Sequence, residues 1–192
     1  MSGSAETLQR IYQLKVTLRG SRPPIWRRVL VPGKFSLHKL HQVIQLAMGW
    51  TDSHLHQFII DGQYYGIPSP EDFEPVRDER RQTLSQIATR EKRKFFYEYD
   101  FGDGWGHEIV VEKILSPEPG IKCPACIKGK RACPPEDVGG LWGYETFLEA
   151  IEDPHHEEHE SYLEWVGGDF DPEACDLDEI NQALARAKWR GR

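Results

Sequence analysis

Three cysteines in the second half of the chain are spaced as metal ligands often are. They read Cys123-x2-Cys126-x6-Cys133, and the first interval is that of a zinc knuckle. Structural zinc takes four ligands in a tetrahedron, so a further ligand must come from a distant part of the chain. The candidates are His155, His156, His159 and Cys175. The spacing predicts half of a zinc site, and free thiols or a cysteine pair that oxidises are the alternatives.

A second group of possible zinc ligands lies in the histidine- and glutamate-rich stretch 154–160. His155 and His159 are spaced i, i+4, as the histidines of HExxH zinc sites are. The stretch reads Pro-His-His-Glu-Glu-His-Glu, so the glutamate is displaced by one position from that motif. Acidic residues at a helix start also favour the helix dipole, and a solvated helix start is therefore the competing explanation.

Histidines and carboxylates also occur together in two earlier segments. His54 and His56 point the same way if the chain is extended there, and the stretch 100–108 (DFGDGWGHE) supplies aspartates and another histidine. Such side chains suit a catalytic metal ion or general acid–base chemistry. Asp and Gly are also the usual residues of a hairpin turn, so an ordinary turn is the alternative.

Charge is distributed unevenly along the 192 residues, whose formal net charge is −7. From Ala132 to Ala185 there is no Lys or Arg, whereas sixteen Asp and Glu occur there. This pattern predicts two solvated faces of unlike sign, or a surface that attracts a charged partner. Nucleic acid could bind only the basic N-terminal half, around Arg77–Arg81 or Arg90–Lys94.

Composition predicts a folded cytoplasmic protein. A hydrophobic fraction of 39% with 11% aromatic residues is ordinary for a globular chain. The first ten residues, MSGSAETLQR, lack the apolar region of a secretion signal, and no apolar run is long enough to span a membrane. Four cysteines in such a protein favour buried thiols, metal ligands or redox chemistry over a disulfide framework.

Hydrophobic periodicity predicts strands first and helices last. We expect strands at 11–18, 25–31, 57–60, 64–65, 94–101 and 107–115, and helices at 37–48, 83–88, 144–151, 155–166 and 176–187. The segments 66–79 and 123–145 are expected to be loops. This order predicts a single α+β domain over 11–188, after a disordered tail at 1–10. Its mainly antiparallel sheet would carry an early helix and a C-terminal group of helices packed on one side.

Two of these elements carry detailed expectations. In 94–101, alternation places four aromatic side chains on one face, namely Phe95, Tyr97, Tyr99 and Phe101. The early helix is capped by Ser36 and ended by Gly49, and its apolar face includes His41. A lone histidine on such a face is expected to be a core residue with satisfied hydrogen bonds rather than a ligand.

Several long segments together resemble one protein family. They are PPIWRRVLVP (23–32), AMGWTDSHLHQF (47–58), YDFGDGWGHEI (99–109), RACPPEDVGGLWGYE (131–145) and GGDFDPEACDLDEIN (167–181). In this order they resemble the plasmid pRiA4b ORF-3-like family, whose relatives include passenger proteins of insertion elements, some labelled TnpR. The resemblance implies an α+β fold, no settled activity and an accessory role on mobile elements. Cys126 and Cys133 fit the family's loop pattern, whereas Cys123 is an addition of this chain.

These observations support three hypotheses about function. The first is a non-enzymatic binding module for a small ligand or a protein partner, with one wall from the 100–107 turn and another from the second half of 123–145. Its cleft would be formed by His54, His56, Asp100, Asp103, Trp105, His107, Glu136, Asp137, Trp142 and Tyr144. The second is a metal-dependent hydrolase or nuclease using His54, His56, His107 and nearby carboxylates, with zinc as a possible cofactor. The third is a DNA-binding accessory protein.

Overall fold

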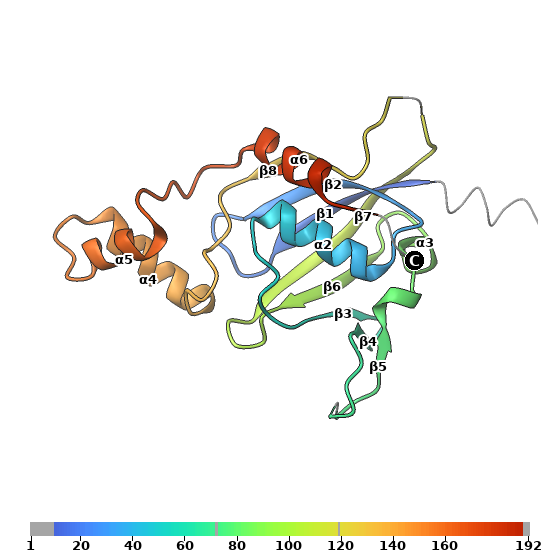
Figure 1. The fold of residues 1–192 in the computed structure, drawn as a ribbon, viewed down its shortest axis with the longest axis horizontal. Helices are drawn as coiled ribbons and strands as arrows, with labels where there is room; N and C mark the ends of the chain where they lie inside the picture. The colour runs from blue at the N-terminus through green and yellow to red at the C-terminus, as the bar shows by residue number, and fades with distance from the viewer. Residues whose placement is uncertain (1–9, 72, 119, 190–192) are drawn as a thin grey trace, which may run out of the picture.

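The computed structural model describes residues 10–71, 73–118 and 120–189. Within these residues eight strands form a single sheet in the order β5-β4-β3-β6-β7-β1-β2-β8 (Figure 1). The strands are β1 (Ile11–Leu18), β2 (Trp26–Pro32), β3 (His56–Ile60), β4 (Gln63–Gly66), β5 (Val76–Asp78), β6 (Lys94–Tyr99), β7 (Trp105–Leu115) and β8 (Ala125–Lys130). Neighbouring strands are antiparallel except for β4 and β5, which are parallel. The predicted α+β class and mainly antiparallel sheet are confirmed.

The helices fall into two groups. They are α2 (Leu37–Met48), the 3-10 helix η1 (Glu79–Arg81), α3 (Leu84–Ile87), α4 (Gly140–Glu152), α5 (His159–Val166) and α6 (Leu177–Arg186). The α2 helix lies across one face of the sheet, and α6 contacts both α2 and β8, whereas α4 and α5 pack on each other at one end (Figure 1). No helix in the described part of the chain has the length and apolar character needed to cross a membrane.

The early helix forms for the reasons that its sequence predicts. The Ser36 side chain accepts a hydrogen bond from the backbone N–H of Lys39, and Gly49 ends the helix in the left-handed conformation. The inward face is apolar, with Leu37, Leu40 and Val43 fully buried against the sheet. Because α2 packs on the sheet through this face, any polar residue on the face is held in a fixed environment.

The hairpin of β6 and β7 is the centre of the core. Phe95, Tyr97 and Tyr99 are almost completely buried, as the alternation predicts. The expectation for Phe101 is wrong, since half of its surface is exposed. The cause is Asp100, whose left-handed backbone (φ 55°) ends the strand and whose carbonyl accepts a hydrogen bond from Gly104. The side chains that follow therefore lose the alternation of β6.

Three segments differ from their predicted secondary structure. The expected loop 66–79 contains β5, which pairs with β4 along its edge, and the expected loop 123–145 contains β8, which pairs with the edge of β2. The helix expected from residue 155 begins at His159, because residues 153–159 form hydrogen-bonded turns first. Residues 1–9 of the predicted disordered tail lie outside the described residues, so that expectation stays a prediction.

Candidate functional site

A pocket of about 620 Å³ opens where α2 approaches β3, β4 and β5. Its polar lining consists of His38, His41, Asp52, His54, His56, Gln57 and Ser69, and its apolar lining of Leu55, Ile67, Pro68, Pro70, Val76 and Phe101. Leu55, Ile67 and Phe101 are each exposed over half of their surface or more. Apolar side chains therefore surround the entrance, and the histidines form the floor.

Glu79 fixes two of the floor histidines from below. Its side chain is completely buried, with Oε1 2.8 Å from His38 Nδ1 and Oε2 2.9 Å from His56 Nε2. Burial raises the pKa of the Glu79 carboxyl, but the hydrogen bonds from the two histidines outweigh it and lower the pKa to about 2. The bond to Glu79 also raises the pKa of His38. Near neutral pH the floor thus contains an ionised carboxylate to which both rings donate.

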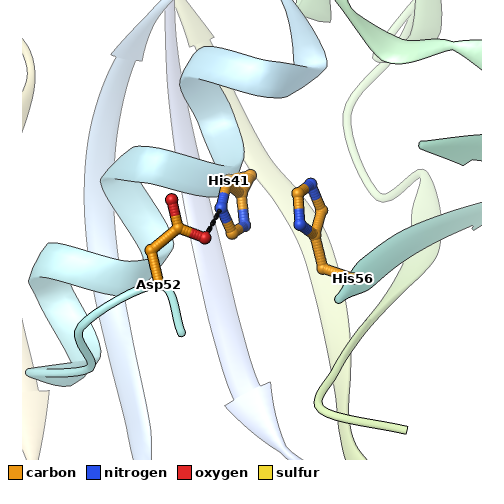
Figure 2. Close-up of side chains that lie close together, drawn as sticks. All are labelled: His41, Asp52 and His56. Carbon is orange, nitrogen blue, oxygen red and sulfur yellow. Dashed lines mark hydrogen bonds and ion pairs between the residues drawn. The ribbon is translucent and has the colours of Figure 1, made fainter. Parts of the chain in front are cut away.

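His41 is hydrogen-bonded through both ring nitrogens. Nδ1 lies 2.8 Å from the Tyr97 hydroxyl and Nε2 lies 2.8 Å from Asp52 Oδ1 (Figure 2). Burial, with the nearby His56, lowers the pKa of His41 to about 4, so the ring is neutral. Its one N–H then donates to Asp52, and Nδ1 accepts from Tyr97, whose pKa burial holds well above its usual value. The prediction of a satisfied core histidine is confirmed.

His41 is nevertheless not a lone histidine, because its ring stacks on that of His56. The ring centroids are 3.4 Å apart and the planes differ by 3° (Figure 2). Together with Asp52 these residues place three potential ligand atoms within 4.8 Å of one another. The nitrogen lone pairs lie in the ring planes, so two parallel stacked rings cannot both aim at one ion. The group therefore serves as a rigid polar floor.

A second group unites three of the predicted site residues. His54 Nε2 lies 3.2 Å from Asp137 Oδ1 and 3.6 Å from Asp100 Oδ2. His54 comes from the segment between α2 and β3, Asp100 from the end of β6 and Asp137 from the segment before α4. Both aspartates have positive φ angles, 55° and 62°, and short polar side chains are among the few that tolerate this conformation. Since His54 also lines the pocket, this group lies at its edge.

The two segments predicted to form the walls do lie side by side. Asp103 Oδ2 accepts a hydrogen bond from the Gly139 backbone N–H at 3.2 Å, and Glu136 accepts from the Tyr99 hydroxyl. Gly140 approaches the turn so closely that a Cβ on it would lie 2.6 Å from the Asp103 carbonyl oxygen. The Gly-Gly pair is therefore needed where the start of α4 packs against the 100–104 turn.

Of the ten predicted cleft residues, only His54 and His56 line the pocket. Asp100 and Asp137 lie beside His54 at its edge, Asp103 and Glu136 join the two wall segments, and the other four lie elsewhere. Trp105 and His107 are completely buried on the inward face of β7, and Tyr144 is buried against Phe147. Burial lowers the pKa of His107 to about 4, so this ring is a neutral core residue. Trp142, in contrast, projects from α4 with 81% of its surface exposed. Alternation on β7 places Trp105 and His107 with Ile109 and Val111, and it could have assigned them to the core.

The predicted zinc ligands are not assembled into a site. Among the described residues, the two groups with metal-ligand spacing contain no cysteine. Cys133 is buried beside Met48 and Arg27, and burial raises the pKa of both Cys123 and Cys133 to about 12. Their thiols therefore stay protonated near neutral pH. His155 precedes α5, and His159 Nδ1 lies 2.9 Å from the Ala150 carbonyl oxygen, so these two do not share a helix face.

Four residues in or directly beneath the pocket floor are absent from the predicted site. They are His38, His41, Asp52 and Glu79. The polar residues at positions 38, 41 and 45 on the apolar early helix are the one local signal for them. Glu79 gives no such signal, because it stands in an Arg-rich stretch that reads as a solvated surface.

Comparison with known proteins places the chain among homologues. The family model described as plasmid pRiA4b ORF-3-like protein matches residues 10–179. A Sinorhizobium fredii (strain NBRC 101917 / NGR234) protein named uncharacterized protein y4hQ is 43% identical over 183 residues, which cover 93% of this chain and 94% of that protein. The crystal structure of MM3350, a protein of unknown function from Methanosarcina mazei Go1, superposes with a TM-score of 0.80 at 39% identity, covering 88% of this chain and 97% of that one. The family match and the y4hQ identity extend over nearly the whole chain, and the chain belongs to the plasmid pRiA4b ORF-3-like family.

Proposed function

We propose that this protein is a binding module whose pocket takes a small organic molecule with an apolar body and a polar end. The observation that carries the proposal is the pocket itself, about 620 Å³ in volume, with a hydrogen-bonded histidine floor and an exposed apolar rim. Small-molecule sites usually combine mostly apolar walls with a few fixed polar groups. The family's description refers to a plasmid reading frame, and an accessory role on mobile elements is the setting that we propose.

The hydrogen bonds of His41 favour a binding role over a catalytic one for this ring. Both nitrogens of His41 are engaged, and one nitrogen each of His38 and His56 is bonded to Glu79. A general base needs a free lone pair near neutral pH, and in His41 that lone pair accepts from Tyr97. The floor can therefore orient the polar end of a ligand through fixed donors and acceptors.

Four of the seven basic residues in the two segments proposed for DNA binding form ion pairs with acidic residues. Arg80 and Arg81 contact Asp78, and Arg93 contacts Asp61 at 2.6 Å. On the open face of the sheet, Lys94 contacts Glu108 at 3.0 Å. Charges paired in this way offer little to a phosphate backbone, whose binding depends on free cationic groups. Binding of a small ligand is therefore better supported than binding of DNA.

The fluorescent probe anilinonaphthalene sulfonate (ANS), which has an apolar body and an anionic end, tests the pocket. We expect saturable binding at one site per chain, measured by fluorescence titration. Ile67→Asp should weaken it by about tenfold or more, because a charge then stands in the apolar rim. Ile127→Asp is the matched control, since Ile127 is also an exposed strand-region isoleucine, at 43% against 56% for Ile67, but lies on β8. Equal loss in both variants, or no saturable binding to the parent protein, would refute the proposal.

A further inference from the structure

We propose that His54, Asp100 and Asp137 bind one divalent metal ion at the edge of the pocket. The three side chains come from three separate segments, and one ligand atom of each lies within 4.8 Å of the others. The site is distinct from the His41–His56 floor, and its occupancy by a metal ion does not depend on the proposed organic ligand.

The spacing of the three side chains is close to that of ligand atoms around one metal ion. A metal ion with bonds of about 2.0–2.2 Å to nitrogen and oxygen holds adjacent ligand atoms about 3.0–3.5 Å apart. The observed separations from His54 Nε2 are 3.2 Å to Asp137 and 3.6 Å to Asp100. A hydrogen bond between these atoms would ordinarily be near 2.9 Å. The separation to Asp137 falls within the range for adjacent ligands, and the separation to Asp100 is 0.1 Å beyond it, so a small adjustment would bring all three atoms to one ion.

The second observation is an unsatisfied nitrogen. His54 Nε2 is buried from solvent and has no hydrogen-bond partner, although two carboxylate oxygens lie close to it. Buried polar atoms without a partner are rare in native proteins and call for an explanation, one of which is a bound ion. An ion between Nε2 and the two carboxylates would satisfy the nitrogen and both oxygens at once.

Asp100 is held in the orientation that a ligand requires. Only 7% of the surface of Asp100 is exposed. Its Oδ1 accepts hydrogen bonds from the backbone N–H groups of Gly102 at 3.0 Å and Asp103 at 3.4 Å. These bonds leave Oδ2 facing His54. Outer hydrogen bonds that fix a ligating carboxylate in this way are a regular feature of metal sites. Two aspartate side chains beside one imidazole also form a ligand set whose carboxylates suit a divalent ion.

The ligand set indicates the class of ion. One imidazole and two carboxylates without a thiolate suit Mn²⁺, Fe²⁺ or Zn²⁺. The Asp137 side chain is 71% exposed, so water can reach the ion from that side. If the pocket binds an organic molecule as proposed above, its polar end could replace such a water, and the ion would then polarise it as a Lewis acid. That consequence is the one part of the inference that rests on the proposed function.

Mn²⁺ is the probe of choice for the experiment, because thiols and surface histidines compete poorly for it. Titration followed by electron paramagnetic resonance on protein freed of metal with a chelator should show one saturable site. Asp137→Asn and His54→Ala should each weaken binding by about tenfold or more. Asp61→Asn is the matched control and should bind as the parent does. Asp61 has the same left-handed backbone (φ 52°) and similar side-chain exposure, 75%, but lies far from His54 in a turn beside Arg93.

Three outcomes would overturn the metal site. One is the absence of saturable Mn²⁺ binding, which would leave an ion pair of His54 with its aspartates. Another is equal weakening by Asp61→Asn. The third is loss of binding in Asp52→Asn with retention in Asp137→Asn, which would assign the ion to the His41–His56 group.

Thermal unfolding of His54→Ala checks its fold, and the exposed Asp137 gives a variant that does not disturb the core. The Mn²⁺ titration contains no ANS, so a negative result would not count against the proposed ligand pocket. Likewise, a negative ANS titration would not count against the metal site.

Discussion

Replacing Glu79 with alanine should lower the free energy of unfolding by about 3–5 kcal/mol, because breaking a buried charged pair leaves its partners uncompensated. The carboxylate is completely buried and bonded to His38 and His56. Its removal leaves two ring N–H groups facing an empty space beneath the pocket. Urea denaturation of parent and variant near neutral pH measures the difference. We also expect the variant to lose ANS binding, since the floor loses its fixed geometry.

Two further variants separate the charge of Glu79 from its shape. Glu79→Gln keeps the volume and one acceptor oxygen, so its loss of stability should be smaller than that of the alanine variant. Glu74→Ala removes an exposed glutamate from the same segment, and its effect should stay within about 0.5 kcal/mol. A loss of less than about 1 kcal/mol in Glu79→Ala would contradict a buried, ionised network at this position.

Lowering the pH should destabilise the protein, because two buried histidines stay neutral in the folded state at pH values where they are protonated in the unfolded chain. The pKa values of His41 and His107 are lowered to about 4, whereas an unfolded histidine titrates near 6.5. Between these values the unfolded chain binds more protons, so stability falls as pH falls. Each histidine should contribute a loss of about 2 kcal/mol between about pH 7 and pH 5. His38 acts in the opposite sense, since its raised pKa gives a stabilisation that is present below 6.5 and lost as pH rises.

Denaturation curves of variants assign this pH dependence. His107→Leu fills a similar volume without a titrating group, so the slope of stability against pH should fall by roughly half. Trp142→Leu replaces an exposed side chain that does not titrate, and it should leave the slope as it is in the parent. An unchanged slope in His107→Leu would show that this ring is not the buried, neutral group described above. A parent protein that gains stability at acid pH would contradict both assignments.

Local signals in the sequence predict much of the fold. The alternating aromatics of β6 and the Ser36 cap both form the expected elements. These features depend on residues within a few positions of one another, which is why they can be predicted. The β5 and β8 strands cannot, because their pairing with distant edges decides whether those irregular segments become extended.

The candidate site divides in the same way. His54, Asp100 and Asp137 were predicted from residue type, and the fold brings them together. The sequence does not predict Glu79 as a site residue, because a glutamate among arginines suggests an exposed surface. It is buried only because η1 packs beneath α2. The prediction for His107 is wrong for the opposite reason. A histidine near a turn suggests a site, but the register of β7 places this one in the core. Tertiary position decides each case.

Chemical-shift mapping of ANS on isotope-labelled protein tests most directly whether the histidine-floored pocket is the binding site. The largest changes in backbone amide signals should occur at Leu55, His56, Gly66 and Ile67, which line the pocket on two sides. The ring signals of His38 and His56 should shift with them, at the same probe concentration. Changes that gather instead on the exposed Trp142 and Trp165 of α4 and α5 would contradict the pocket as the site of this protein.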